Sequence, residues 1–286
     1  MLPNGQIFDL AKSPMPRIVL CSSGGLYGAL VLNCFLSDST VDVVGIVRST
    51  RVLNPRYGWL RGAFEQLRLS GSAYTLYLGC ATTLPDALGR WSGVSSLAVS
   101  ARRRRIPLYA TRNLNEPTAV DFVAELQPDL LVSAFFNQRI GESISGLPSA
   151  GAVNIHPSLL PDYKGVDPVF HARLRGETRL GVTVHRIEPA FDTGPLLVQH
   201  EVEVADHCSL MRATAQLFVR GARSLLDFLP DLMSGAPGCP QRNGGRYDSW
   251  PTPEQVSSYR RSGHELVSTR DWRLLVSAGG GIDLGA

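Results

Sequence analysis

The segment from Arg17 to Leu26, RIVLCSSGGL, decides which fold this sequence predicts. Residues 17–21 form a short apolar and β-branched run, and two serines followed by two glycines interrupt it. Residues 26–36 continue with apolar side chains at helical spacing. A strand, a glycine turn and a helix in this order open a βαβ unit, so the segment predicts an α/β protein.

Three more strands are predicted in the first half of the chain, at residues 41–47, 106–110 and 129–136. A Ser-, Ala- and Arg-rich helical stretch precedes the second of them, and a helix at 117–126 precedes the third. Near-continuous apolar strands that alternate with helices are typical of parallel sheets. We therefore expect a Rossmann-like, mostly parallel sheet with helices on both faces. The stretch 54–80 does not allow an assignment.

The pattern changes after residue 150, where strands follow one another closely. Strands at 181–188 and 196–204 are joined by so short a connection that they are expected to be antiparallel. The other elements predicted here are a strand at 151–156, a helix at 169–174 that starts after Asp167 and Pro168, and a helix at 210–228. Residues 17–232 are expected to form the main domain, and residues 233–286 a loop-rich extension, irregular or with a small hairpin.

Composition excludes several classes of protein. The 286 residues are 44% hydrophobic and 19% charged, which suits a large buried core and excludes a mainly disordered chain. The net charge of +3 leaves only the run Arg102–Arg105 as a basic patch, and it suits the C-terminal end of a helix, so no nucleic-acid partner is expected. No apolar run approaches a membrane span, and five scattered cysteines without a CxxC pair indicate free thiols, so we expect a cytoplasmic protein without a membrane partner.

The most informative polar residues are Asn154 and His156, in the string NIHPSLLP. Positions i and i+2 of a strand project to the same face, so the amide and the imidazole point together. Pro157 ends the strand directly after them, at the edge where open parallel sheets bind ligands. Such a pair suits a site that polarises a carbonyl and moves a proton, although a hydrogen-bonded structural pair has the same pattern.

A carboxylate follows in the loop after strand 181–188, at Asp192 in FDTG. If that strand lies beside strand 151–156, Asp192 can reach His156 and fix its tautomer. An aspartic protease is a weaker interpretation of this Asp-Thr-Gly motif. Those enzymes need two such carboxylates, and this chain has one.

An NADP-dependent oxidoreductase remains a second alternative. The turn Ser22–Gly25 lacks the GxGxxG spacing, and Val47-Arg48-Ser49 stands where an acidic ribose contact is expected. An enzyme that uses NADP could exploit Arg48 and Arg51 instead, which keeps this alternative open. The histidines show no metal-ligand spacing, so no metal site is expected.

Together these segments resemble the 10-formyltetrahydrofolate-dependent formyltransferases. The residues that carry the resemblance are Gly151-x-x-Asn154-Ile-His156-Pro-Ser158-Leu-Leu-Pro161-x-Tyr163-Lys-Gly165, Gly181-Val-Thr183-x-His185 and Asp192-x-Gly194. The resemblance runs from about residue 17 to 230 and implies a formyltransferase catalytic domain over 17–232.

The resemblance implies roles for particular residues and a formyl donor, 10-formyltetrahydrofolate. It makes Asn154, His156 and Asp192 the catalytic residues. It also places the folate between the segment after the fourth strand and the loop 187–192, with much of the recognition through backbone groups. The implied folate contacts are Phe136, Gln138, Arg139, Ile140, Ile187, Glu188 and Phe191.

Departures from the relatives bear on the acceptor. The purine-pathway enzyme has a Gly-Ser-Asn phosphate cradle after its first strand, which Ser23–Tyr27 lacks, and the tRNA enzyme carries a C-terminal barrel larger than the 54 residues after 232. A small amine is expected instead, on an amino sugar nucleotide or as an ornithine-like amine. A methionyl-tRNA formyltransferase-like enzyme with a reduced C-terminal region, or a non-catalytic folate-binding scaffold, stays open. A homodimer stays open too. The tail around Arg246–Thr252 could help to form or cover the acceptor site, could form a dimer contact, or could simply pack as a strap on the edge of the domain.

Overall fold

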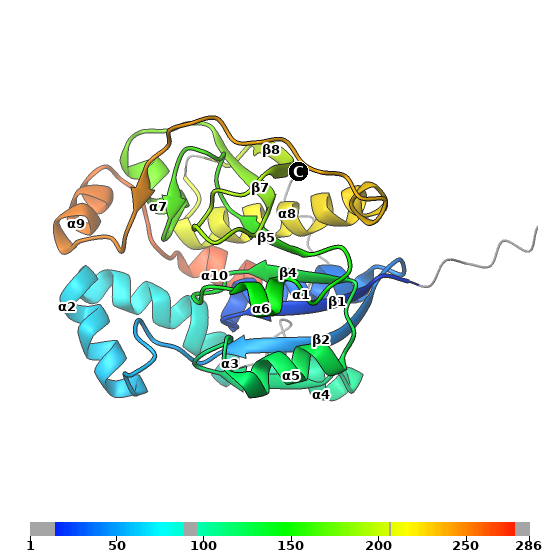
Figure 1. The fold of residues 1–286 in the computed structure, drawn as a ribbon. Coiled ribbons are helices and arrows are strands. Elements are labelled where there is room, and N and C mark those ends of the chain that lie inside the picture. Colours follow the sequence, from blue (N-terminus) through cyan, green and yellow to red (C-terminus); the bar gives the residue numbers. More distant parts are fainter. Residues whose placement is uncertain (1–14, 89–95, 206, 278–286) are drawn as a thin grey trace, which may run out of the picture.

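A seven-stranded sheet forms the centre of the molecule, in a computed structural model that describes residues 15–88, 96–205 and 207–277 (Figure 1). Its order is β3-β2-β1-β4-β5-β7-β8, in which the first five strands are parallel and β7 and β8 are antiparallel additions. This arrangement confirms the predicted fold class. The strands are β1 Arg17–Ser22, β2 Asp42–Ser49, β3 Leu108–Thr111, β4 Leu130–Ala134, β5 Ala152–His156, β7 Leu180–Arg186 and β8 Leu196–Val202.

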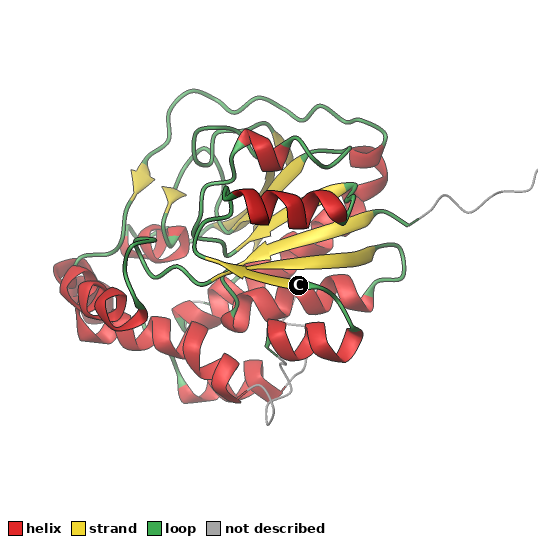
Figure 2. Cartoon of the chain, turned by 60° about the horizontal axis from the view of Figure 1, so that its bottom comes forward, coloured by secondary structure: helices red, strands yellow, loops and turns green. Residues whose placement is uncertain are grey.

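Helices cover both faces of the sheet, as Figure 2 shows. Alternate residues of the same strand enter different cores: Ile18 and Leu20 belong to the larger hydrophobic cluster, and Val19 and Cys21 to the smaller one on the other face. Strands buried on both faces have to be apolar at every position, which explains the continuous run at 17–21. The helices are α1 Gly25–Ser37, α2 Trp59–Leu78, α3 Leu84–Leu88, α4 Leu97–Arg104, α5 Pro117–Glu125, α6 Glu142–Ser145, α7 Pro168–Leu174, α8 Leu210–Met233, α9 Pro253–Arg261 and α10 Thr269–Ser277, with a short π-helical stretch at Gly79–Thr83.

The predicted start of α7 and the predicted role of the arginine run at the end of a helix are both confirmed. Asp167 caps α7 by accepting from the Phe170 amide, with Pro168 in the first turn. The arginine run ends α4, with Arg105 in the left-handed conformation at its C-cap. Among the helices in the described ranges, none has both the length and the apolar run that a bilayer crossing requires.

The structure adds one helix where no prediction was made and corrects one prediction. Residues 54–80, for which the sequence allowed no assignment, contain the 20-residue helix α2. The extension after residue 232 was expected to be irregular or a small hairpin, but its described part holds two nine-residue helices, α9 and α10. It also holds the short strand β9 (Tyr247–Asp248), which pairs in parallel with β6 (Lys164–Gly165) and not with a neighbour in its own segment. The division of the chain at residue 232 stays a prediction.

Candidate functional site

The antiparallel pairing of β5 with β7 gathers polar side chains on one face of the sheet. Asn154 lies opposite His185, and His156 lies opposite Thr183. The neighbouring position, Ile155, points the other way and contacts α8 so closely that a Cβ added at Gly221 would lie 2.4 Å from it. The sequence prediction that Asn154 and His156 share a face is thus confirmed, and that face is the one opposite α8.

His156 lies between two hydrogen-bond acceptors. Its Nε2 lies 3.0 Å from the carbonyl oxygen of Tyr163, and its Nδ1 lies 3.6 Å from Oδ1 of Asp192. Since a carbonyl can only accept, Nε2 carries a proton. Ser158 donates to the same carbonyl at 3.1 Å. The ring is 5% exposed, so both of its nitrogens are directed at protein groups in this arrangement.

Asp192 reaches His156 from the loop between β7 and β8, as the sequence predicted. Its backbone has a φ of 55°, and its carboxylate accepts from the Gly165 amide at 2.8 Å through Oδ2. Oδ1 lies 3.6 Å from His156 and 3.7 Å from Nε2 of His185, so one oxygen faces two imidazoles. Burial acts to raise the pKa of Asp192, but His156 and the Gly165 amide outweigh it and hold that pKa well below its ordinary value.

His185 is a site residue that sequence reasoning missed. Its Nδ1 donates to the Arg186 carbonyl oxygen at 2.7 Å, which leaves Nε2 as an acceptor for the Nδ2 group of Asn154 at 3.2 Å. The orientation of the Asn154 amide follows from this partner, because the amide oxygen could not donate to Nε2. The signal was present in the sequence, since residues 183 and 185 alternate along a strand that pairs with residues 153–156.

The segment after β4 and the loop after β7 meet in one apolar cluster. Ile140 is buried in the smaller core, and Phe136 and Ile187 pack partly buried against it. These three implied folate contacts are therefore brought together. Three further implied folate contacts, Arg139, Glu188 and Phe191, are exposed, and Phe191 has 53% of its surface exposed.

Gln138 has a different environment from the other implied folate contacts. Its side chain is 4% exposed and turned into the protein. It accepts from the Leu114 amide at 2.7 Å and donates to Ser49 Oγ at 2.7 Å and to the Thr111 carbonyl at 3.0 Å. The amide thus joins the ends of β2 and β3 to the loop after β4, and the backbone of residue 138 is what remains for a ligand.

The glycine turn after β1 is filled by a side chain of the protein. Asp86, from α3, forms an ion pair with Arg48, and its Oδ2 lies 3.5 Å from the position of a Cβ added at Gly24. A carboxylate therefore occupies the position where a helix N-terminus would otherwise attract a phosphate. Arg48, which the NADP alternative required for a ligand, has this carboxylate as its partner.

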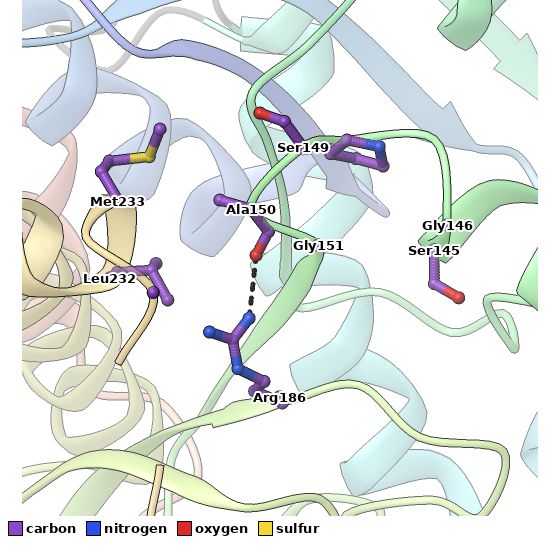
Figure 3. Close-up of a pocket in the computed structure, with 10 residues that line it drawn as sticks. Ser145, Gly146, Ser149, Ala150, Gly151, Arg186, Leu232 and Met233 are labelled. Atoms are coloured by element: carbon purple, nitrogen blue, oxygen red, sulfur yellow. Dashed lines mark hydrogen bonds between the residues drawn. The ribbon is translucent and has the colours of Figure 1, made fainter. Parts of the chain in front are cut away.

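A cavity of about 460 Å³ lies at the amino end of β5 (Figure 3), and His156 is not among the residues that line it. It is lined by the turn before β5, by Arg186 and by Leu232 and Met233 at the end of α8. The Arg186 guanidinium donates to the Ala150 carbonyl at 2.8 Å, as the dashed line in Figure 3 shows, and to the Ala236 carbonyl at 2.8 Å. In the described ranges, no group of three or more His, Cys, Asp or Glu side chains could hold a metal ion.

Known proteins are similar to this chain in sequence. Residues 89–226 match the family described as "Formyl transferase". The methionyl-tRNA formyltransferase of Thermotoga neapolitana is 31% identical over 151 residues, which are 53% of this chain and 48% of the relative. The chain thus spans about half the length of the curated relatives it matches.

Solved structures are similar in fold. A 4-N formyltransferase from Francisella tularensis has a TM-score of 0.54 at 13% identity, over 94% of this chain and 88% of that one. A sugar 3N-formyl transferase, in the presence of dTDP and 5-N-formyl-THF, has a TM-score of 0.51 at 18% identity, over 83% of this chain and 70% of that one. At these identities the similarity concerns the architecture of the sheet and its helices.

Proposed function

Because the chain contains a formyl transferase family domain at residues 89–226, we propose that it transfers a formyl group from 10-formyltetrahydrofolate to the amine of a small-molecule acceptor. The observation that carries the proposal is the convergence of Asn154, His156 and Asp192 on one face of β5, although Asp192 comes from a separate loop. An amide donor beside an imidazole that is held by a carboxylate can stabilise an oxyanion and move a proton, as acyl transfer to an amine needs.

Asn154 is the first of the groups that would act on the formyl oxygen. One of its two Nδ2 hydrogens is taken by His185, so the second remains for an oxygen that gains negative charge. Bound 10-formyltetrahydrofolate supplies a formyl group on a nitrogen that can leave. Asn154 is held before the reaction, and a donor that needs no reorganisation stabilises the developing charge most effectively.

His156 and Asp192 would manage the proton. The Nε2 proton of His156 now faces the Tyr163 carbonyl, and a formyl oxygen could replace that carbonyl as the acceptor. The low pKa of Asp192 keeps it a carboxylate and makes it a weak base. Its role is therefore to hold the imidazole in place, while the imidazole, directly or through a water, takes the proton that the attacking amine loses and passes a proton to the leaving nitrogen of the folate.

The folate fits what lies beside these residues. Phe136 and Ile187, which are half-buried and pack on the same core as Ile140, offer apolar surface to a flat ring, and Gln138 makes the loop after β4 rigid enough to present backbone groups. Arg139 is exposed at this loop and would suit the carboxylates of a folate's glutamate tail. The folate contacts at Glu188 and Phe191 remain proposals.

A small acceptor is favoured by two observations. Asp86 fills the anion position at the glycine turn, so a phosphate of the acceptor is not expected to bind there. In its described part the extension after residue 232 forms α9, α10 and the short strand β9, and no barrel. An amino sugar nucleotide or an ornithine-like amine is the proposed acceptor. The sequence similarity to methionyl-tRNA formyltransferases keeps tRNA as the second candidate.

The test is a screen of amines with purified protein and 10-formyltetrahydrofolate, following each acceptor by its mass. The panel contains nucleotide-linked amino sugars, ornithine, N-hydroxyornithine and methionyl-tRNA. Addition of one formyl group to a small amine, and not to the tRNA, is the expected result. Binding of 5-formyltetrahydrofolate without transfer to any member would support a folate-binding scaffold instead, and absence of any folate binding would remove the proposal.

A further inference from the structure

The segment Gly238–Asp248, which we call the strap, runs from the end of α8 towards α9 and crosses the loops that carry the catalytic groups (Figure 1). At its start, Cys239 exchanges two backbone hydrogen bonds of 2.7 Å with Leu196, at the base of the Asp192 loop. Further on it passes over the 161–166 loop so closely that a Cβ at Gly245 would lie 1.8 Å from the Pro161 carbonyl oxygen. The strap therefore lies against both loops that meet at His156.

Gln241 fastens the strap to the backbone of the Asp192 loop. Its Nε2 donates to the carbonyl oxygen of Asp192 at 3.1 Å and to that of Gly194 at 2.8 Å. One amide group thus uses both of its hydrogens to tie the two ends of a three-residue turn. Asp192 has a left-handed φ of 55°, a conformation that costs free energy for a residue with a side chain and has to be held by its surroundings.

The end of the strap fixes the other partner of Asp192. Strand β9 pairs with β6 through hydrogen bonds from Lys164 N to Arg246 O at 2.9 Å and from Val166 N to Asp248 O at 2.8 Å. Between these two bonds lies Gly165, whose amide donates to the Asp192 carboxylate. Asp248 is itself held by two hydrogen bonds from Arg175, at 2.9 and 2.6 Å.

We propose that Gln241 is a positioning residue for the formyl transfer: together with strand β9 it holds the carboxylate of Asp192 against His156, so the C-terminal extension is part of the active site. The catalytic part of this inference rests on the proposed function. Gln241 acts through Asp192 and touches no reacting atom. A misplacement of about 1 Å in a catalytic group can cost on the order of a hundredfold in rate, which sets the expected size of the effect.

The test compares Gln241→Met with Gln255→Met. Methionine has nearly the shape of glutamine but cannot donate, so Gln241→Met removes both hydrogen bonds to the Asp192 turn. Gln255 lies in the same extension, where its side chain closes the capping box of α9 by accepting from the Thr252 amide at 2.9 Å. The control thus weakens the extension without touching the Asp192 loop.

Two readouts report the position of Asp192 without any acceptor. The ¹⁵Nδ1 resonance of His156 at fixed pH reports its contact with the carboxylate, and hydrogen exchange of the Gly165 amide reports its bond to Oδ2. In Gln241→Met we expect the resonance to shift and the Gly165 amide to exchange about tenfold or more faster, as the loss of two hydrogen bonds implies. In Gln255→Met both are expected to stay as in the unaltered protein. With an acceptor from the screen, kcat is expected to fall about 10- to 100-fold in Gln241→Met with little change in KM for the folate.

The proposal is overturned if Gln241→Met leaves both readouts unchanged, or if Gln255→Met alters them as much. Should Gln241→Met not fold, Gln241→Asn decides the matter, because it keeps the amide but is one methylene too short to bridge both carbonyls; its readouts are expected to change in the same direction. If the protein formylates no amine, the proposed function is wrong. The His156 resonance and the exchange of the Gly165 amide then still decide whether Gln241 positions Asp192.

Discussion

The side chain of His185 accepts a hydrogen bond from that of Asn154 across the β5–β7 pairing, with 3.2 Å between Nε2 and Nδ2. Because Nδ1 is committed to the Arg186 carbonyl, this contact fixes which end of the Asn154 amide faces the site. We expect His185→Gln to lower kcat about 10- to 100-fold, since the amide can then turn its oxygen towards the formyl group. His200→Gln, on neighbouring strand β8, is the matched control, and an equal loss in both variants would contradict the role of His185.

Removal of the imidazole itself should cost more. His156→Ala is expected to lower the rate of formyl transfer by roughly 10²–10⁴, the usual range for general acid–base groups. Binding of 5-formyltetrahydrofolate, measured by calorimetry, should change little, because the proposed folate surface is formed by Phe136 and Ile187. Unchanged turnover in His156→Ala would refute the catalytic assignment.

The carboxylate of Asp192 should make stability depend on pH. Its pKa in the folded protein is lower than in the unfolded chain, where it is about 4, so ionisation stabilises the fold above that pH. This stabilisation is lost as the pH falls towards the folded-state pKa. We therefore expect Asp192→Asn to have a lower melting temperature than the unaltered protein at pH 7, with a difference that shrinks below about pH 4. A constant difference from pH 7 to pH 3 would exclude this linkage.

Gln138 should support both the fold and the folate loop. Gln138→Leu leaves the Leu114 amide without its partner and removes two hydrogen bonds to Ser49 and Thr111, so we expect the free energy of unfolding to fall by about 2–4 kcal/mol. The exposed Glu125→Gln on α5 should change it by less than about 0.5 kcal/mol. Denaturant melts give both values. If the loop presents backbone groups to the folate, binding of 5-formyltetrahydrofolate should weaken in Gln138→Leu at temperatures where the variant is still folded.

The sheet could be predicted because its strands are buried on both faces. Runs such as residues 18–21 and 130–132 are apolar at every position, and the glycine turn and the antiparallel β7–β8 connection follow from short-range pattern. The contact of His156 with Asp192 could be expected from the resemblance and the strand order. Gln138 could not have been placed, because its three partners lie 24, 27 and 89 positions away in the sequence.

Helix α2 escaped prediction for a physical reason. In its first half Leu60 and Phe64 are 77% and 58% exposed, whereas Gly62, Gln66 and Ser70 are buried, so there the apolar face is not the buried face. A periodicity analysis assumes the opposite. Gly71, with a φ of 77°, interrupts the helix as well.

Helix α9 was missed although it has a start signal. The pattern Thr252-Pro253-x-Gln255 is a capping box with proline in the first turn, and the polar composition of the tail obscured it.

The place of the strap in the chain has a consequence for how the protein matures. During synthesis, a nascent chain that has left the ribosome as far as Gly235 already contains all seven strands of the main sheet. It does not yet contain Gln241 or strand β9, which hold the Asp192 turn and its partner Gly165. The sheet can therefore form co-translationally before the segment that holds the Asp192 turn has emerged.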